Sequence, residues 1–283
     1  MRWRIEHALS YRYSRPVALD TQTIRLRPRL DSRQQVPKFE LDIRPKPSFL
    51  TRYNDPENNL LTTAWFEGTH PKLEIIARSE VELTDHEPYD FILTEPAMTK
   101  LPLVYQEPLM SLLGVYTSLD KEASPILKEF LKPVLLEAKN ETVPFLNGLA
   151  VYIFKRLKRK ERKNENPWAP EKTLEKGQGA CRDLAWLYVV ACRSLGLAAR
   201  FVSGYHVPFN PRKKPELHAW AEVFLPGAGW VGFDSGFGTA VSERYIALAA
   251  SYDPALTLPT DGKFWGTGVK SVLKAAITIE PVA

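Results

Sequence analysis

Apolar and polar residues alternate through the first third of the chain with the two-residue period of a β-strand. Trp3 and Ile5, for example, stand between charged residues, as on a strand with one buried and one exposed face. Clusters of turn-forming residues such as Asn54–Asn59 separate successive runs of this kind. Residues 1–85 therefore predict several short antiparallel strands that fold as a β-sandwich or barrel.

The apolar pattern changes to the period of a helix after residue 123. Ser124 followed by Pro125 is typical of a helix start. The pattern predicts one helix to about residue 138, which Pro133 should bend or break, and a second helix over residues 145–163. Residues 164–176 are expected to form a loop.

The segment between these two patterns, residues 86–123, is rich in proline and has no clear period. We place a domain boundary inside it. The predicted division is a β-rich N-terminal domain over residues 1–105 and a second domain over residues 106–283.

The clearest helical pattern in the chain begins at Cys181 and ends before Gly196. Its apolar residues lie on one helical face: Leu184, Leu187, Ala191 and Leu195. Cys181 is thus expected in the first turn, where unpaired backbone N–H groups and the helix dipole stabilise a thiolate. The alternative is that Cys181 is a small buried apolar residue.

Beyond Gly196 the pattern again predicts strands, over residues 199–207, 217–225 and 230–234. Residues 245–266 are expected to form a loop interrupted by prolines, before a final apolar run. Helices and strands follow each other in blocks, so the fold class is α+β.

Composition and cysteine content narrow the class of protein. The chain has 283 residues, 44% of them hydrophobic, which is enough for a large core or two domains. No long apolar window predicts a membrane span, and the charged start does not resemble a signal peptide. The two cysteines, Cys181 and Cys192, would lie roughly 16 Å apart on one helix, too far for a disulfide. We expect free thiols, a cytoplasmic location and no membrane partner.

The formal net charge is +5, and much of the excess comes from residues 155–163. Such a run could form a nucleic-acid surface. No aromatic ladder or nucleic-acid motif accompanies it, and cations near a helix C-terminus are favoured by the dipole. We therefore expect a solvated helix end and no nucleic-acid partner.

Three side chains form a candidate constellation for nucleophilic catalysis: Cys181, His218 and Asp234. A nucleophilic thiol needs a base, and the base needs a third group that fixes its tautomer. His218 begins one predicted strand and Asp234 ends the next. Because an even number of residues separates them, they share a sheet face only if the hairpin loop is odd in length or a bulge intervenes. An unbulged four-residue loop at 226–229 would place them on opposite faces.

Alternatives to this constellation stay open. His218 could be a structural histidine and Asp234 a turn residue. His206 is a competing base, but no acid lies beside it in the sequence. A metal site would need both histidines to converge with Cys181 and Cys192, whose spacing matches no zinc pattern. We expect no metal and no cofactor.

The segments that contain Cys181, His218 and Asp234 resemble the motifs of a known protein family. The chain resembles the bacterial transglutaminase-like superfamily in three motifs and the segment between them: Gly179–Asp183, His218–Val223, Gly229–Asp234 and Leu195–Tyr205. The N-terminal part is similar to the β-rich domain that precedes this core in many bacterial members, at Tyr11–Val17 and Ile24–Arg29. The resemblance implies a papain-like core, in which a helix carrying the cysteine packs on an antiparallel sheet carrying the histidine and the acid.

By this resemblance Cys181 is the nucleophile, His218 the base and Asp234 the orienting acid. The implied activity is acyl transfer from a peptide or amide through a thioester, with hydrolysis by a cysteine peptidase or amidase favoured over protein cross-linking. A non-catalytic peptide-binding module on the same fold is a further alternative. Gln178 is a candidate oxyanion donor and Trp220 a candidate cleft wall, whereas Asp183 is expected to hydrogen-bond locally at the helix start.

Overall fold

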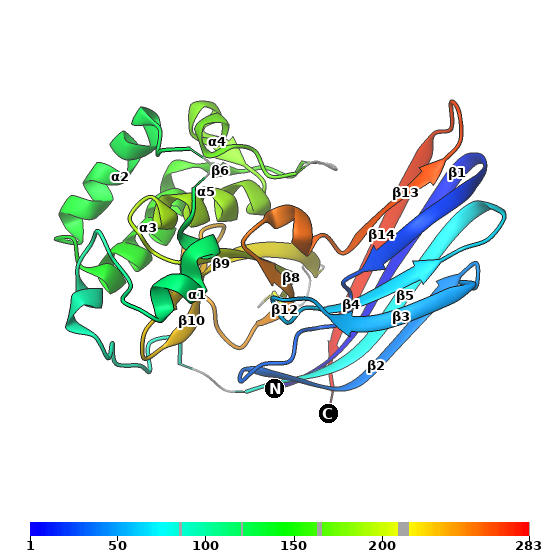
Figure 1. The fold of residues 1–283 in the computed structure, drawn as a ribbon, viewed down its shortest axis with the longest axis horizontal. Helices are drawn as coiled ribbons and strands as arrows, with labels where there is room; N and C mark the ends of the chain where they lie inside the picture. The colour runs from blue at the N-terminus through cyan, green and yellow to red at the C-terminus, as the bar shows by residue number, and fades with distance from the viewer. Residues whose placement is uncertain (85–86, 120, 163–165, 209–214, 283) are drawn as a thin grey trace.

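Three layers build the molecule, as seen from one end of Figure 1 to the other: a group of helices, a five-stranded sheet and a large curled sheet. The computed structural model describes residues 1–84, 87–119, 121–162, 166–208 and 215–282. None of the helices in these ranges is both long enough and apolar enough to span a membrane.

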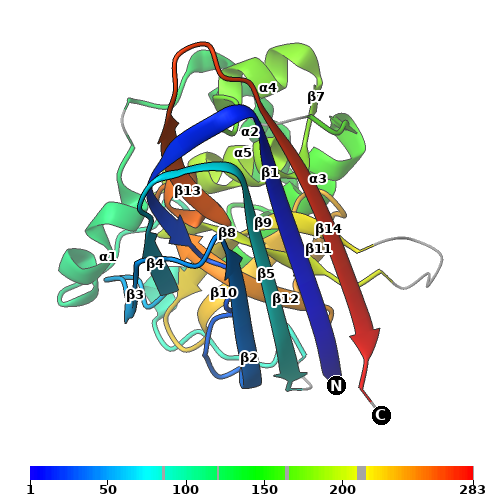
Figure 2. The same ribbon diagram turned by 90° about the vertical axis from the view of Figure 1, so that its right-hand side faces the viewer.

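The large sheet is antiparallel and has seven strands. Five come from the start of the chain, in the order β2-β5-β1-β4-β3, and two from its end pair with β1. Its strands are β1 (Arg2–Ile24), β2 (Gln34–Arg44), β3 (Phe49–Asn54), β4 (Leu60–Trp65), β5 (Thr69–Leu83), β13 (Thr260–Trp265) and β14 (Ser271–Pro281). Figure 2 shows β14 as the outermost strand on one side of this sheet, beside β1.

The helices lie on the opposite side of the molecule and enclose the larger apolar core. They are α1 (Leu109–Thr117), α2 (Pro125–Glu137), α3 (Thr142–Arg156), α4 (Pro170–Lys176) and α5 (Cys181–Arg193). Two short strands, β6 (Lys158–Arg159) and β7 (Gln178–Gly179), pair in parallel beside them.

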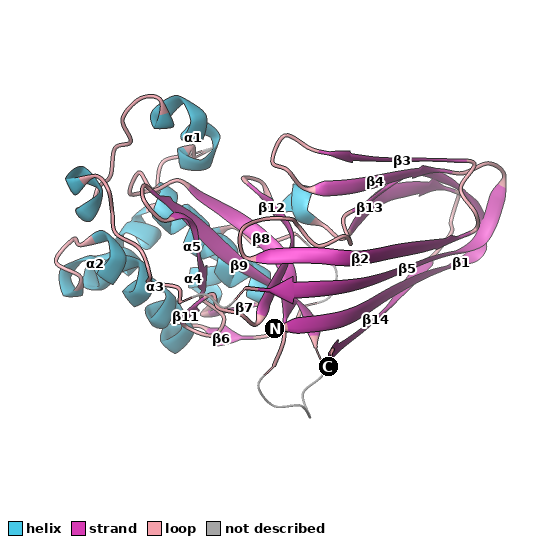
Figure 3. Ribbon diagram, turned by 90° about the horizontal axis from the view of Figure 1, so that it is seen from below, coloured by secondary structure: helices cyan, strands magenta, loops and turns pink. Residues whose placement is uncertain are grey.

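The middle layer is the five-stranded sheet, ordered β11-β10-β9-β8-β12. Its strands are β8 (Ala199–His206), β9 (Glu216–Leu225), β10 (Gly229–Asp234), β11 (Thr239–Ala240) and β12 (Tyr245–Ser251). Alternate residues of β9, such as Ala219 and Ala221, pack into the helical core, while Tyr205 and Ile246 pack into the core of the large sheet. The middle sheet is therefore buried on both faces, as the view in Figure 3 also shows.

The expected α+β fold is confirmed: an N-terminal antiparallel β-rich region is followed by a part in which the helix that carries Cys181 packs on an antiparallel sheet. The N-terminal sheet is a single curled sheet, like half a barrel (Figure 2). Strands β13 and β14 show that residues after 105 complete it, while the boundary at residue 105 stays a prediction.

Several local expectations are wrong for physical reasons. Residues 245–266 contain two strands, because a wholly buried strand such as β12 shows no polar alternation. The helix predicted to residue 163 ends at Arg156, since Lys158 pairs with the segment before Cys181; its predicted end at Lys163 lies outside the described residues. Of the loop expected over 164–176, the last seven residues form α4.

Two prolines also have less effect than expected. Helix α2 continues through Pro133, which lies on its exposed face, where water is available to the carbonyl left without a partner. The sequence Ser14-Arg15-Pro16 is a turn signal that predicts a break between two strands. In the structure it lies at a shift of register within β1, between Arg12 and Val17, and the strand runs on to Ile24.

Candidate active site

Cys181 is the first residue of α5, as expected from the sequence, and its side chain is half-buried. The first N–H groups of a helix have no partner within the helix, so they and the helix dipole favour negative charge beside this thiol. The other cysteine, Cys192, is buried in the same helix, and both thiols are free.

The start of α5 is fixed by Asp183, a buried carboxylate. Its Oδ2 accepts a hydrogen bond from the Ala180 N–H at 2.7 Å, and its Oδ1 accepts one from the Trp168 N–H at 2.8 Å. Arg162 donates to both oxygens, at 3.0 and 2.7 Å. Burial alone would raise the pKa of Asp183, but these donors hold that pKa below its ordinary value. Asp183 thus sets where the helix begins, which is the local role expected for it.

The hairpin of β9 and β10 places His218 and Asp234 on one sheet face. Gly229 pairs with Leu225, so the loop is residues 226–228, which is three residues rather than four. The odd loop length meets the geometric condition that the even separation of His218 and Asp234 imposes. Gly227 and Gly229 make this loop possible because both have positive φ, at 94° and 71°.

His218 and Asp234 are joined by a hydrogen bond of 2.6 Å between Nε2 and Oδ2, and both side chains are fully buried. The carboxylate also accepts from the Tyr245 hydroxyl at 2.8 Å and from the Gly236 N–H at 2.7 Å. Burial alone would raise the pKa of Asp234, but the imidazole and these donors lower it. The acid is therefore held ionised in a buried site.

The imidazole of His218 is turned so that Nε2 faces the acid, while Nδ1 has no partner at hydrogen-bonding geometry among the described residues. Burial alone would lower the pKa of His218. The charge and hydrogen bond of Asp234 outweigh it, the nearby Cys181 thiol adds to them, and the pKa rises to about 9. The three side chains expected to meet are thus gathered in one place, with the imidazole next to the thiol and bonded to the acid.

A cavity of about 680 Å³ opens beside this group and is lined by both Cys181 and His218. Its other walls come from residues far apart in the sequence, including β1, β14 and the segment that leads into β13. This volume is typical of small-molecule and peptide sites. The N-terminal sheet, in which the sequence shows no chemical motif, thus forms part of the cavity that contains the thiol.

His206, the competing base, lies near Cys181, His218 and Asp234, but its contact with His218 is between rings, and no hydrogen bond joins it to any of the three within the described part of the chain. Its ring centroid is 5.8 Å from that of His218 and 4.6 Å from that of Phe237. Burial, with the neighbouring His218 adding to it, lowers the pKa of His206 to about 4. His206 is therefore neutral at neutral pH and packs beside the imidazole of His218.

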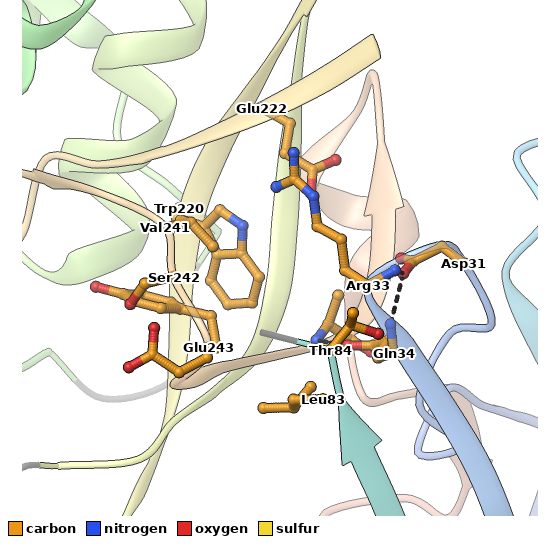
Figure 4. Close-up of a pocket in the computed structure, with 12 residues that line it drawn as sticks. Asp31, Arg33, Gln34, Leu83, Thr84, Trp220, Glu222, Val241, Ser242 and Glu243 are labelled. Carbon is orange, nitrogen blue, oxygen red and sulfur yellow. Dashed lines mark hydrogen bonds between the residues drawn. The ribbon is translucent and has the colours of Figure 1, made fainter. Parts of the chain in front are cut away.

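The two weaker site candidates lie elsewhere. Trp220 is 1% exposed and packs against His218 and Tyr245, so it supports the imidazole from within the core and does not form a cleft wall. Trp220 lines a separate cavity of about 30 Å³. Figure 4 shows it there, between the middle sheet and the start of β2, near Arg33 and Gln34. Gln178 is half-buried in β7 and is not among the residues that line the large cavity.

Tyr245 is the main residue that sequence reasoning missed. It begins β12, a segment expected to be a loop, and nothing in its local pattern indicates a contact with Asp234. Within the described part of the chain, no group of three or more His, Cys, Asp or Glu side chains could hold a metal ion.

The chain is similar to other proteins over almost its whole length. An uncharacterized protein from Mycobacterium tuberculosis (strain ATCC 25618 / H37Rv) is 27% identical over 293 residues, with 99% of this chain and 93% of the relative covered. One from Mycobacterium leprae (strain TN) is 23% identical over 274 residues, covering 94% of each. A crystal structure from Cytophaga hutchinsonii, named "Putative Cysteine Protease", has a TM-score of 0.72 at 15% identity, covering 100% of this chain and 92% of that one. At that identity the likeness concerns the fold alone.

Two family models match the chain and together cover more than half of it. Residues 3–82 match the bacterial transglutaminase-like N-terminal region, and residues 129–235 match the transglutaminase-like superfamily. The second match includes all three of Cys181, His218 and Asp234. The protein belongs to the transglutaminase-like superfamily and carries the bacterial N-terminal region ahead of its core.

Proposed function

We propose that this protein is a thiol-dependent acyl-transfer enzyme that cleaves peptide or amide bonds through Cys181, His218 and Asp234. One observation carries the proposal. His218 is buried between the Asp234 carboxylate, at 2.6 Å, and the Cys181 thiol, in a cavity large enough for a peptide. A structural histidine has no need of an open cavity and a thiol beside its imidazole.

The chemistry follows from these positions. At neutral pH the raised pKa of His218 keeps the thiol proton on the imidazole, and the Cys181 sulfur attacks the amide carbon and forms an S–C bond. The imidazolium then gives its proton to the amine as the C–N bond breaks, which leaves a thioester. A water molecule loses a proton to His218 and attacks the thioester, and the S–C bond breaks to release the acid.

Asp234 holds the imidazole in the required tautomer and stabilises its cation. The oxyanion that forms during each attack lies at the start of α5, where the Cys181 N–H points out of the helix. Gln178 is a weaker candidate for a second hydrogen-bond donor to the oxyanion, since it lies in β7 and does not line the cavity.

Hydrolysis is favoured over cross-linking because a cross-linking enzyme must protect its thioester from about 55 M water while an amine arrives. No described residue lining the cavity marks a separate amine site. We also propose a peptide or protein substrate in the cytoplasm. Two free thiols support a reducing compartment.

Nucleic-acid binding is not part of the proposal. In the basic run of residues 155–163, Arg159 pairs with Glu216 and Arg162 with Asp183. These guanidinium groups are held by carboxylates of the protein and are not free to bind phosphates.

The test is alkylation of Cys181 by iodoacetamide at neutral pH, with the modified site located by mass spectrometry. Wild type should react at Cys181 at least ten times faster than a free thiol, and His218→Ala should lose that advantage. The buried Cys192 is the internal control and should stay unmodified. Because His218 is buried, His218→Gln and a thermal melt check that the loss does not come from unfolding.

Acid quenching after addition of a peptide mixture should trap an acyl group on Cys181 whose mass is that of a peptide fragment. Putrescine added before the quench separates hydrolysis from cross-linking, since a transglutaminase would yield the amine adduct as the main product. Alkylation at the rate of a free thiol, unchanged in His218→Ala, would contradict the enzyme and leave the peptide-binding module.

A further inference from the structure

One wall of the cavity that contains the thiol is a patch on two paired strands, β1 and β14, whose side chains all lie on the same face of the sheet. Leu9 of β1 pairs with Ala275 of β14, and the pairs on either side are His7 with Ile277 and Tyr11 with Leu273. Alternate residues of a strand share a face, so all six side chains point from one sheet face into the cavity. We call these six residues the β1–β14 wall.

Two polar atoms of this wall are bonded to other parts of the protein. His7 Nδ1 is 2.9 Å from the Tyr205 hydroxyl, and the Tyr11 hydroxyl is 2.6 Å from Thr260 Oγ1. Burial lowers the pKa of His7 to about 4, so the ring is neutral at neutral pH. What the wall offers to the cavity is hydrocarbon: one isoleucine, two leucines, an alanine and ring edges.

The charged side chains that reach the cavity from the core are likewise engaged. Arg162 is paired with Asp183, Glu216 with Arg159, and Arg182 donates to the Arg162 carbonyl at 3.0 Å. Leu217 and Pro259 add more apolar surface beside His218. A polar or charged substrate group would lose water against the apolar side chains of the β1–β14 wall without gaining a partner from them.

Resting on the proposed function, we propose that the β1–β14 wall is the specificity site, and that the enzyme selects acyl donors whose acyl part carries a bulky apolar side chain. The acyl part stays on Cys181 through both half-reactions, so a wall that binds it acts on both. The amine, by contrast, leaves at the end of the first half-reaction, so a site that binds it acts on that half-reaction alone. In this arrangement the core supplies the chemistry and the N-terminal sheet chooses the substrate.

The structure offers a matched pair of variants on one strand. Ala275 faces the cavity, whereas its neighbour Ala276 is exposed on the opposite face of β14 and pairs with Ala8. Ala275→Trp fills the cavity, and Ala276→Trp places the same side chain outside it. Both positions are exposed, so neither substitution overpacks a core.

The probes are iodoacetamide, N-acetyl-leucine chloromethyl ketone and N-acetyl-glycine chloromethyl ketone, each corrected for its rate with free 2-mercaptoethanol. In wild type the leucine probe should alkylate Cys181 about tenfold or more faster than the glycine probe, as expected for several added methylene groups in an apolar site. Ala275→Trp should remove this preference, with the rate of each chloromethyl ketone expressed relative to the iodoacetamide rate of the same variant. Ala276→Trp should behave as wild type.

The two proposals fail in different ways. A wild-type iodoacetamide rate no higher than that of a free thiol overturns the proposed function. When the iodoacetamide rate is fast, two results overturn the role of the β1–β14 wall in specificity. One is that the leucine and glycine probes react equally well, and the other is that the two tryptophan variants slow the leucine probe to the same extent.

Discussion

The Asp234 carboxylate accepts two hydrogen bonds on one oxygen, from His218 at 2.6 Å and from Tyr245 at 2.8 Å. Burial and the adjacent carboxylate raise the pKa of Tyr245, so the phenol keeps its proton and donates it. Tyr245 is therefore a positioning residue that acts through the acid. It limits how far the carboxylate can turn away from the imidazole.

Tyr245→Phe should lower the free energy of unfolding by about 2 kcal/mol, because a hydrogen bond to a buried charge is lost. It should also slow alkylation of Cys181 several-fold. Urea denaturation and iodoacetamide kinetics measure the two effects. The control is Tyr188→Phe, which removes a buried phenol that donates to the Leu146 carbonyl at 2.8 Å. An equal loss of thiol reactivity in the control would contradict the positioning role.

The raised pKa of His218 sets a pH window for stability. In the folded protein that pKa is about 9, against 6.5 for an unperturbed imidazole, so the native state holds the proton more tightly than the unfolded state. The stability that this provides is complete below about pH 6.5 and is lost as the pH rises through 9. The difference in unfolding free energy between wild type and His218→Gln should therefore shrink by about 3 kcal/mol across this window. A constant difference in urea denaturation across that range would contradict it.

At the scale of elements, α5 illustrates how an element brings a side chain to the site. Its apolar period, and the glycine that follows it, predict both ends of the helix from sequence alone. The hairpin of β9 and β10 could also be predicted, since strand parity restricts the loop length once both residues are placed on the same face.

Element β12 could not be predicted in the same way. All seven of its residues are buried, so it lacks the polar alternation by which an exposed strand is found. With β12 missed, the contact of Tyr245 with Asp234 was missed as well. Tyr245 could not be predicted as a site residue because β12 is buried on both faces.

Asp183→Asn should lower the free energy of unfolding by about 3 kcal/mol, because it removes the buried negative charge that pairs with the Arg162 guanidinium. It should also slow alkylation of Cys181, since the Ala180 N–H loses its acceptor at the helix start. Glu129→Gln, which breaks the exposed pair with Lys132, is the control and should change neither quantity measurably. Equal melting temperatures for the two variants would contradict this role of Asp183.

At the scale of the whole molecule, side-chain amides of the N-terminal region satisfy the edge of the middle sheet. The Gln34 amide both donates to the Ala247 carbonyl, at 2.8 Å, and accepts from the Ala247 N–H, at 2.9 Å. Asn59 does the same at Ala250. These contacts tie the curled sheet to the strand that carries Tyr245. No local sequence pattern predicts them, because their partners lie about 200 residues apart.

Gln34→Ala should lower the free energy of unfolding by about 2 to 4 kcal/mol, since the buried N–H and carbonyl of Ala247 both lose a partner. It should also reduce Cys181 reactivity, because Tyr245 lies two residues before Ala247 on β12. Gln35→Ala removes an exposed amide from the neighbouring position and is the matched control. Urea denaturation measures the free energy of unfolding of both variants. Equal losses in Gln34→Ala and Gln35→Ala would contradict this role of Gln34.

The pairing of β1 with β13 and β14 has a consequence for how the protein is made. During synthesis β1 leaves the ribosome first, and the strands that complete one of its edges leave more than 230 residues later. At about 5 to 20 residues per second, that delay is roughly 10 to 50 seconds. The nascent chain therefore exposes an unpaired edge of β1 throughout that delay, and the compartment around Cys181 is closed only after β13 and β14 have emerged.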